Sequence, residues 1–269
     1  MTDTAVDRLT PWRAPAPWQA VDFISDLHLQ SAEPATFERW RAFMQRPLTA
    51  HADALVILGD FFEVWAGDDL LQAEAPSEAR DFAQTCVDLL KTHSTHRPIF
   101  FMHGNRDFLL GSDAMSAAGM SELADPTLLE MHGKRCLLTH GDALCLDDTE
   151  YQSFRSMVRS PEWQARFLSR PLKERLAITR QLREQSEAKK MASGQDTATW
   201  ADVDSTAARQ WLNAVNATVL IHGHTHRPDV HDLGSGLERM VLSDWDASAT
   251  PPRAEVLRWD LQGLRRIAI

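Results

Sequence analysis

Seven side chains of the kinds that bind divalent metal ions follow short apolar runs in this chain of 269 residues. They are Asp26, His28, Asp60, Asn105, His140, His222 and His224. Carboxylate oxygens, amide oxygens and imidazole nitrogens are ligands for hard and borderline divalent ions. Two of the pairs are spaced by two residues, and alternate residues of an extended segment point the same way. We therefore predict that Asp26 with His28, and His222 with His224, each converge on one ion.

The apolar runs are predicted to be the strands that position these ligands. Residues 55–58 are four apolar residues in a row, which is typical of a strand buried on both faces of a parallel sheet. The run ends at Gly59, which permits a turn, and Asp60 follows it. Further strands are predicted at 21–25, 98–102, 136–139 and 217–221. Because ligands of open α/β sheets bind at the carboxyl ends of the strands, we predict one site at that edge.

Helices and a second sheet are predicted around these strands. Apolar residues recur at three- and four-residue spacing in residues 33–44, 75–93 and 203–213, which indicates amphipathic helices. Three more strands, at 237–242, 254–259 and 264–269, are predicted to complete a second sheet. The fold class is therefore α/β.

The order of the motifs resembles that of the calcineurin-like metallophosphoesterases. The pattern of that family is D-x-H, G-D, G-N-[HR]-[DE], H and G-H-x-H, and all five blocks occur in this order between Asp26 and His226. The resemblance implies a four-layer α-β-β-α sandwich and a centre of two divalent metal ions, commonly Mn²⁺. The types of ligand alone also fit Fe, Zn or Co.

The same resemblance implies a role for each ligand. Asp60 would bridge the two ions, with Asp26, His28 and His224 on one ion and Asn105, His140 and His222 on the other. Two ions held in this way activate water for attack on phosphorus. The residues implied in catalysis are Asp60, Asn105, Arg106 and His222. We expect His103, His226, Asp107 and Asp142 to support the ligands or the structure rather than to bind the ions.

Arg106 is informative because many members of the family have histidine at this position. That histidine can protonate a departing alkoxide, whereas an arginine cannot donate a proton at neutral pH. A departing phosphate is already a weak base and needs no such proton. Arg106 can instead pair with phosphate oxygens, so the sequence favours cleavage of a pyrophosphate bond.

Longer stretches resemble a narrower family, the UDP-2,3-diacylglucosamine pyrophosphatases of the lipid A pathway. The stretches are residues 59–69, 103–111, 140–148 and 222–228, and the resemblance covers nearly all of the chain after about residue 18. It implies that the substrate is a UDP-linked diacyl glucosamine lipid, which is split into UMP and a diacylglucosamine 1-phosphate. The implied substrate contacts are Asn105, Arg106, Asp148, Arg183, Ser186, Lys190 and His222.

Residues 151–190 are helical by their periodicity and differ in charge from the rest of the chain. They contain ten Lys and Arg against four Glu, a local charge of +6 in a chain of formal net charge −10. We predict a helical cap, residues 151–199, inserted into a core formed by 19–150 and 200–269, with residues 1–18 as a flexible arm. A solvated helical face is the simpler interpretation, but the inverted charge favours binding of an anionic, partly apolar molecule.

The composition limits the location and the partners. The net charge of −10 argues against a nucleic-acid binder. No run approaches the ~18 apolar residues of a membrane span, and the first 18 residues do not resemble a secretory signal. Three cysteines without C-x-x-C spacing indicate reduced thiols in the cytosol. We expect a monomer that contacts the cytoplasmic face of the inner membrane peripherally.

Two other functions remain open on the sequence. A nucleotide or dinucleotide pyrophosphatase would use the same metal ligands, although the apolar cap argues against it. A non-catalytic binding module would not need the complete ligand set. A nucleotide pyrophosphatase should not need acyl chains, so turnover that depends on them would argue against the first alternative. Metal-dependent hydrolysis would argue against a non-catalytic binding module. A nuclease is disfavoured by the acidic composition.

Overall fold

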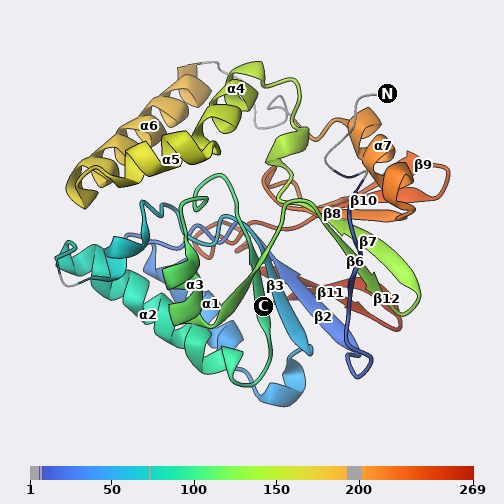
Figure 1. Ribbon diagram of the computed structural model, residues 1–269. Coiled ribbons are helices and arrows are strands. Elements are labelled where there is room, and N and C mark those ends of the chain that lie inside the picture. The colour runs from blue at the N-terminus through green and yellow to red at the C-terminus, as the bar shows by residue number, and fades with distance from the viewer. Residues whose placement is uncertain (1–5, 7, 73, 193–201) are drawn as a thin grey trace.

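The protein is a two-sheet sandwich covered by helices (Figure 1), seen in a computed structural model. The structure describes residue 6 and residues 8–72, 74–192 and 202–269. In this part of the chain one sheet has the strand order β12-β11-β2-β3-β4-β5, and the other has the order β1-β6-β7-β8-β10-β9. The predicted α-β-β-α sandwich is confirmed.

The first sheet is built around the strand predicted at residues 55–58. β3 (Ala54–Leu58) lies parallel to β2 (Ala20–Ile24) and β4 (Ile99–Met102), and all of its residues are buried. Val56 and Leu58 face the second sheet, whereas Leu55 and Ile57 pack in the cluster under the helices. Both faces of β3 are therefore covered, which explains its continuous apolar sequence.

The remaining strands divide between the two sheets. β5 (Met120–Leu123), β11 (Glu255–Asp260) and β12 (Gly263–Ala268) complete the first sheet. The second sheet contains β6 (Thr127–Met131), β7 (Lys134–Leu138), β8 (Val219–His222), β9 (Val230–Gly234) and β10 (Leu237–Val241). The three C-terminal strands were predicted to join one sheet, and this is wrong: β10 pairs with β8, whereas β11 pairs antiparallel with β2.

Helices cover the outer faces of both sheets. α1 (Pro34–Met44), α2 (Ser77–Ser94) and α3 (Ser112–Ala118) lie on the first sheet, and α7 (Ser205–Val215) lies on the second (Figure 1). The short 3₁₀ turns are η1 (Leu48–Ala50), η2 (Asp68–Leu71) and η3 (Asp142–Leu144). The predicted helices at 33–44, 75–93 and 203–213 agree with α1, α2 and α7 to within two residues at each end.

Part of the segment predicted to be a flexible arm forms a strand in the structure. Trp12–Arg13 form β1, which pairs in parallel with Leu129 and Glu130 of β6. The rings of Trp12 and Trp18 pack against Phe100, with centroids 4.5 and 6.1 Å apart. The partly buried rings of Trp12 and Trp18 give this proline-rich segment apolar contacts with the core.

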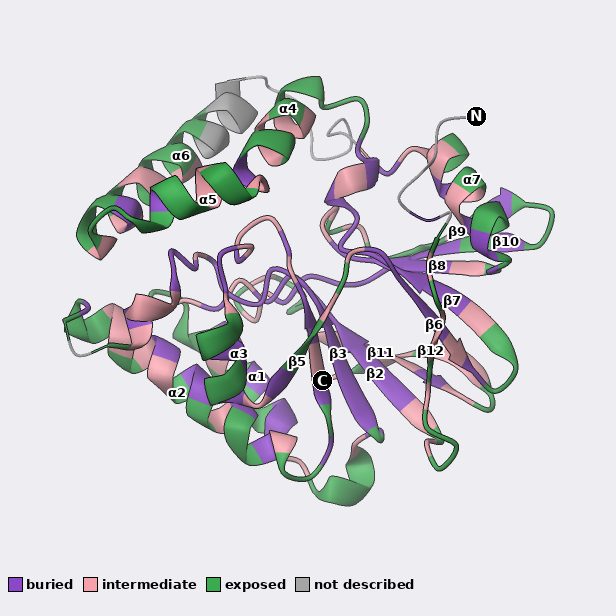
Figure 2. Ribbon diagram, viewed as in Figure 1, coloured by how far each residue is buried: buried purple, intermediate pink, exposed green. Residues whose placement is uncertain are grey.

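Three helices lie in the segment that was predicted to be an insert, and we refer to them as the cap. They are α4 (Thr149–Val158), α5 (Pro161–Leu168) and α6 (Leu172–Ala192), and they form a separate layer in Figure 1. Residues 193–199 of the predicted insert lie outside the described residues. Figure 2 shows that the cap is mostly exposed or partly exposed, in contrast to the buried strands.

Candidate metal centre

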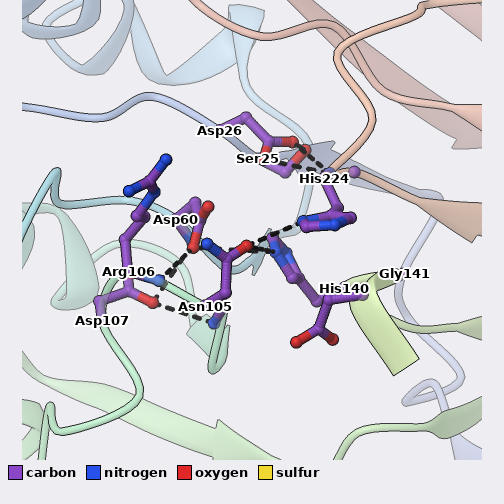
Figure 3. A network of polar contacts seen from close by, with 12 residues as sticks. Ser25, Asp26, Asp60, Asn105, Arg106, Asp107, His140, Gly141 and His224 are labelled. Atoms are coloured by element: carbon purple, nitrogen blue, oxygen red, sulfur yellow. Dashed lines mark hydrogen bonds and ion pairs between the residues drawn. The ribbon is translucent and has the colours of Figure 1, made fainter. Parts of the chain in front are cut away.

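Six of the seven predicted ligands gather where strands of both sheets end. Figure 3 shows Asp60, Asn105, His140 and His224 pointing toward one another. Asn105 lies between two of the imidazoles, with its Oδ1 3.0 Å from Nε2 of His140 and 2.8 Å from Nδ1 of His224. The carboxyl-edge site predicted from the strand pattern is therefore present.

The backbone at the ligands is turned rather than extended. A positive φ is found at Asp26 (54°), His28 (49°), Asp60 (52°), His224 (66°) and His226 (53°). Ligand pairs converge because sharp left-handed turns follow the strands, so the predicted alternation of an extended segment is the wrong reason. Such backbone conformations are uncommon outside glycine, and they concentrate at functional sites.

Asp60 occupies the middle of the site. Its Oδ1 lies 3.7 Å from Nε2 of His140, and its Oδ2 lies 3.9 Å from Nε2 of His28. The main-chain N–H of Arg106 donates a hydrogen bond of 2.8 Å to Oδ1 and holds the carboxylate in this orientation. The two oxygens thus face two different histidines, which is the arrangement that a bridging carboxylate requires.

Two groups of side chains could each hold an ion. In the first, ligand atoms of Asp26, His28 and His226 lie within 4.8 Å of one another, and in the second those of Asp26, Asp60 and His140 do. Within the first group, Nε2 of His226 lies 3.1 Å from Nε2 of His28 and 3.4 Å from Oδ1 of Asp26. His226 was predicted to be a supporting residue, but it belongs to the first group of side chains that could hold an ion.

His222 is placed differently from the prediction. It is fully buried, its Nδ1 lies 2.8 Å from the carbonyl of Gly223, and its Nε2 has no hydrogen-bond partner in the described part of the chain. Neither group of potential ligands includes His222 or His224, but only His224 contacts another predicted ligand, with Nδ1 2.8 Å from Oδ1 of Asn105 among the described residues. Burial, together with the Arg239 charge, lowers its pKa to about 3.

A signal for this correction was present in the sequence. The G-H-x-H pattern begins at Gly223, so its two histidines are His224 and His226. The predicted pair was displaced by two residues because His222, His224 and His226 alternate along one short segment. The structure places His224 beside Asn105 and His140, and His226 beside His28.

The loops that carry the ligands are held by main-chain contacts. Asp107 accepts hydrogen bonds from the N–H groups of Phe61 at 2.8 Å and Gly104 at 2.9 Å, so it joins the Asp60 and Asn105 loops. A Cβ atom on Gly104 would lie 2.1 Å from Oδ1 of Asp60, so the loops meet too closely for a side chain there. Asp107 therefore joins the two loops, which is consistent with the supporting role expected for it.

The hydrogen bond on the far side of His140 orients its ring. Nδ1 of His140 lies 2.8 Å from the carbonyl of Leu58, which can only accept, so Nδ1 carries the proton and Nε2 faces Asp60 and Asn105. Burial disfavours the charged imidazole, but the carboxylates of Asp60, Asp142 and Asp26 outweigh it and raise the pKa of His140 to about 9. The next ligand behaves in the opposite way: burial and the His140 charge lower the pKa of His224 to about 4.

Tyr151 and Asp142 connect the cap to the ligands. The Tyr151 hydroxyl donates a 2.5 Å hydrogen bond to Asp142, and the Tyr151 ring stacks on His224 at 5.9 Å between centroids. Nε of Arg155 donates to the same carboxylate at 2.9 Å. Asp142 thus supports the site by anchoring α4. Tyr151 and Arg155 were not predicted, because their contacts depend on how α4 docks.

The predicted substrate contacts occupy several places. The Nε atom of Arg106 is buried, with no hydrogen-bond partner among the described residues. Asp148 caps α4 by accepting from the N–H of Tyr151 at 2.9 Å, and Arg183 forms an ion pair with Glu63. Ser186 and Lys190 belong to α6, but their side chains lie outside the described part.

The residues present fit a pair of divalent cations. Asp26 and Asp60 are buried carboxylates that belong to one group, and two such charges are costly together unless cations neutralise them. Oxygen and imidazole ligands surround them, which is the mixture that Mn²⁺ and related ions accept.

Comparison with known proteins identifies the class. The sequence profile described as "Calcineurin-like phosphoesterase" matches residues 20–228. The chain belongs to this family.

Within the family, the chain is similar to proteins named UDP-2,3-diacylglucosamine hydrolase. The protein from Chromobacterium violaceum is 42% identical over 257 residues, which cover 93% of this chain and 99% of the relative. The Xanthomonas campestris protein is 42% identical over 254 residues (90% and 96%), and the Bordetella pertussis protein is 41% identical over 245 residues (90% and 92%).

Proposed function

We propose that this chain hydrolyses the pyrophosphate bond of UDP-2,3-diacylglucosamine to UMP and 2,3-diacylglucosamine 1-phosphate. The relatives that are named as hydrolases of this substrate match the chain over 92–99% of their own length. The observation that carries the proposal is the bridging geometry of Asp60, which suits a two-metal hydrolase. One water is consumed, and each phosphate of the broken bond leaves with one product.

We assign the metal ligands with His226 in place of His222. Asp26, His28, Asp60 and His226 would hold one ion, and Asp60, Asn105, His140 and His224 would hold the other. Bound metal ions of this kind polarise a phosphoryl oxygen and lower the pKa of water. The mixed oxygen and nitrogen ligands suit Mn²⁺.

Arg106 provides the positive charge that the substrate needs. Its main-chain N–H is bonded to Asp60, so its side chain starts beside the bridging carboxylate. Its buried Nε is available to a phosphate oxygen. Because the guanidinium keeps its proton, Arg106 stabilises charge on the two phosphates and does not act as an acid.

The cap is the proposed binding surface for the acyl chains and the membrane. Its helices expose Met157, Leu168 and Leu182, which are 50, 41 and 41% exposed, among the many arginines of this segment. Apolar side chains set among cations suit a lipid that carries a diphosphate. Within the described residues, no helix has both the length and the apolar character that crossing a membrane requires. We propose peripheral contact of a monomer with the cytoplasmic face of the inner membrane.

Release of UMP tests the function directly. Purified protein with Mn²⁺ and UDP-2,3-diacylglucosamine should release UMP, and UDP-N-acetylglucosamine, which lacks the acyl chains, should react far more slowly. Asp60→Ala should abolish the release. Equal turnover of acyl-free nucleotide pyrophosphates would favour the nucleotide pyrophosphatase instead, and no hydrolysis with any metal would favour a binding module.

A further inference from the structure

Glu63 lies between the proposed metal centre and the cap. Its side chain is nearly buried, with Oε2 3.1 Å from Nδ1 of His28. Its other oxygen, Oε1, forms an ion pair with Nε of Arg183 on α6. One carboxylate therefore contacts a proposed metal ligand on one side and a cap helix on the other.

Glu63 lies where a carboxylate that orients the His28 ring would lie. The other ring nitrogen of His28 faces the metal groups, at 3.1 Å from Nε2 of His226 and 3.9 Å from Oδ2 of Asp60. Histidines that bind metals usually donate their second N–H to a carboxylate or a carbonyl, which fixes the ring. For His140 that partner is the carbonyl of Leu58. For His28, Oε2 of Glu63 lies 3.1 Å from Nδ1 in an ion-pair contact, and no hydrogen bond to Nδ1 is formed within the described residues.

The loop that carries Glu63 also contacts α6 at Ala66 and Asp69. Arg175, near the start of α6, is 2% exposed, and its guanidinium contacts the carbonyl of Ala66 and the carboxylate of Asp69. Arg183 lies eight residues further on, about two helical turns, and contacts the same loop at Glu63. The loop that begins at the bridging Asp60 is thus held to α6 at two points.

We propose that Glu63 is a positioning residue that couples the docking of α6 to the orientation of His28. The inference rests on the proposed ligand set. With metal bound, the His28 ring is fixed, Glu63 is fixed by His28, and Arg183 then has a rigid partner. Coupling between two sites is reciprocal, so a docked α6 raises the affinity for metal by the same factor as metal favours docking.

Metal affinity distinguishes positioning from simple charge. We expect Glu63→Gln to weaken Mn²⁺ binding about 10–100-fold, as for other residues that orient metal ligands. Arg183→Met removes a positive charge near the cations, so electrostatics alone predicts tighter binding. Coupling through Glu63 predicts binding that is weaker by about fivefold. Arg183→Lys should restore part of the loss, and Arg180→Met, at an exposed position of the same helix, is the matched control.

Hydrogen exchange of the full chain measures how bound Mn²⁺ affects the docking of α6. Mn²⁺ should slow amide exchange in peptides from residues 176–185 of the wild-type protein by about fivefold, and this protection should disappear in Glu63→Gln and in Arg183→Met. The protection should persist in Arg180→Met. Unchanged melting temperatures of the metal-free variants show that each is folded.

The results separate failure of the coupling between α6 and His28 from failure of the proposed metal centre. Tighter Mn²⁺ binding in Arg183→Met, or metal protection of α6 that survives in both variants, overturns the coupling. Wild-type protein that binds Mn²⁺ without any change in exchange of α6 also overturns it, while the metal centre stands. Wild-type protein that binds no Mn²⁺ refutes the proposed metal centre itself. If Glu63→Gln fails to fold, Arg183→Met still decides the matter through the sign of its effect.

Discussion

The oxygens of Asp60 and the imidazoles around them set the chemistry of this molecule. Asp60 faces His140 with one oxygen and His28 with the other, and a hydrogen bond from the main-chain N–H of Arg106 holds it there. Five ligand or ligand-adjacent residues have a left-handed backbone, which costs free energy that the surrounding fold must supply. The geometry of the centre is thus determined by the turns and not by flexible side chains.

Substitution of Arg106 by histidine should change the preferred leaving group. Arg106→His adds a group that can protonate an alkoxide, and it removes a permanent charge from the phosphates. We expect the ratio of phosphodiester turnover to pyrophosphate turnover to rise by about 10²-fold, within the range for an added general acid. Rates with an aryl phosphodiester and with UDP-2,3-diacylglucosamine measure the ratio. An unchanged ratio would count against the role of Arg106.

The affinity for metal should depend on pH through His140. In the metal-free protein the pKa of His140 is raised to about 9, so near neutral pH a proton occupies this ligand and must leave before metal binds. Affinity for Mn²⁺ should therefore rise with pH, by roughly tenfold per pH unit between about pH 7 and 9, and then level off. Isothermal titration at several pH values measures this. Affinity that is constant across the window would show that His140 is not a ligand.

At the scale of elements, strands deliver the ligands and the cap is fixed by a few buried contacts. α4 is anchored by Asp142, through Tyr151 and Arg155, and α6 by Arg175. These polar contacts join the cap helices to the core, whereas most of the surface of those helices is exposed or partly exposed (Figure 2). The docking of the cap therefore depends on individual arginines more than on apolar area.

Removal of the Arg175 anchor should destabilise the protein. Arg175→Met leaves the Ala66 carbonyl and the Asp69 carboxylate without their partner, at a cost of about 2 kcal/mol, because Asp69 is partly exposed and regains some water. Arg180→Met, on the exposed face of α6, should change stability by less than about 0.5 kcal/mol. Urea unfolding measures both. Equal stability of the two variants would show that Arg175 does not stabilise the docked position of α6.

The strand β3 was predictable from its local sequence, whereas the edge strand β9 was not. The apolar run at 55–58 predicts β3 because it has no exposed face. β9 (Val230–Gly234) is an edge strand with mostly exposed or partly exposed residues, so it lacks an apolar run to mark it. Which sheet each C-terminal strand joins depends on pairing across the molecule, as with β11 beside β2, and no local pattern records it.

The site was predictable where a motif names the residue, and not where docking creates the contact. The ligands from Asp26 to His140 follow from the motif order, and His226 follows from the G-H-x-H pattern once the pattern is placed correctly. The roles of Tyr151 and Glu63 could not be predicted from the sequence. Tyr151 stacks on His224, and Glu63 contacts Arg183, only when the cap packs on the core.

At the scale of the whole molecule, an acidic chain concentrates negative charge at its buried centre. Asp26, Asp60 and Asp142 are all buried, in a protein of formal net charge −10. Bound cations would neutralise part of this charge in the folded state only. The stability of the whole molecule should therefore depend on metal.

Metal should raise the melting temperature. At a free Mn²⁺ concentration about 100 times Kd, binding adds about 2.7 kcal/mol to folding, which corresponds to roughly 5–10 °C for a chain of this size. Thermal unfolding with Mn²⁺ and with EDTA measures the difference. Asp60→Ala should show a much smaller difference, and a shift of equal size in that variant would mean that the ion binds elsewhere.

Anomalous diffraction from crystals grown with Mn²⁺ would locate the two ions and their ligands. We expect two manganese peaks that share Asp60, one completed by Asp26, His28 and His226 and the other by Asn105, His140 and His224. A single peak, a pair of peaks that do not share Asp60, or a manganese ion bound to His222 would refute the proposed two-metal centre.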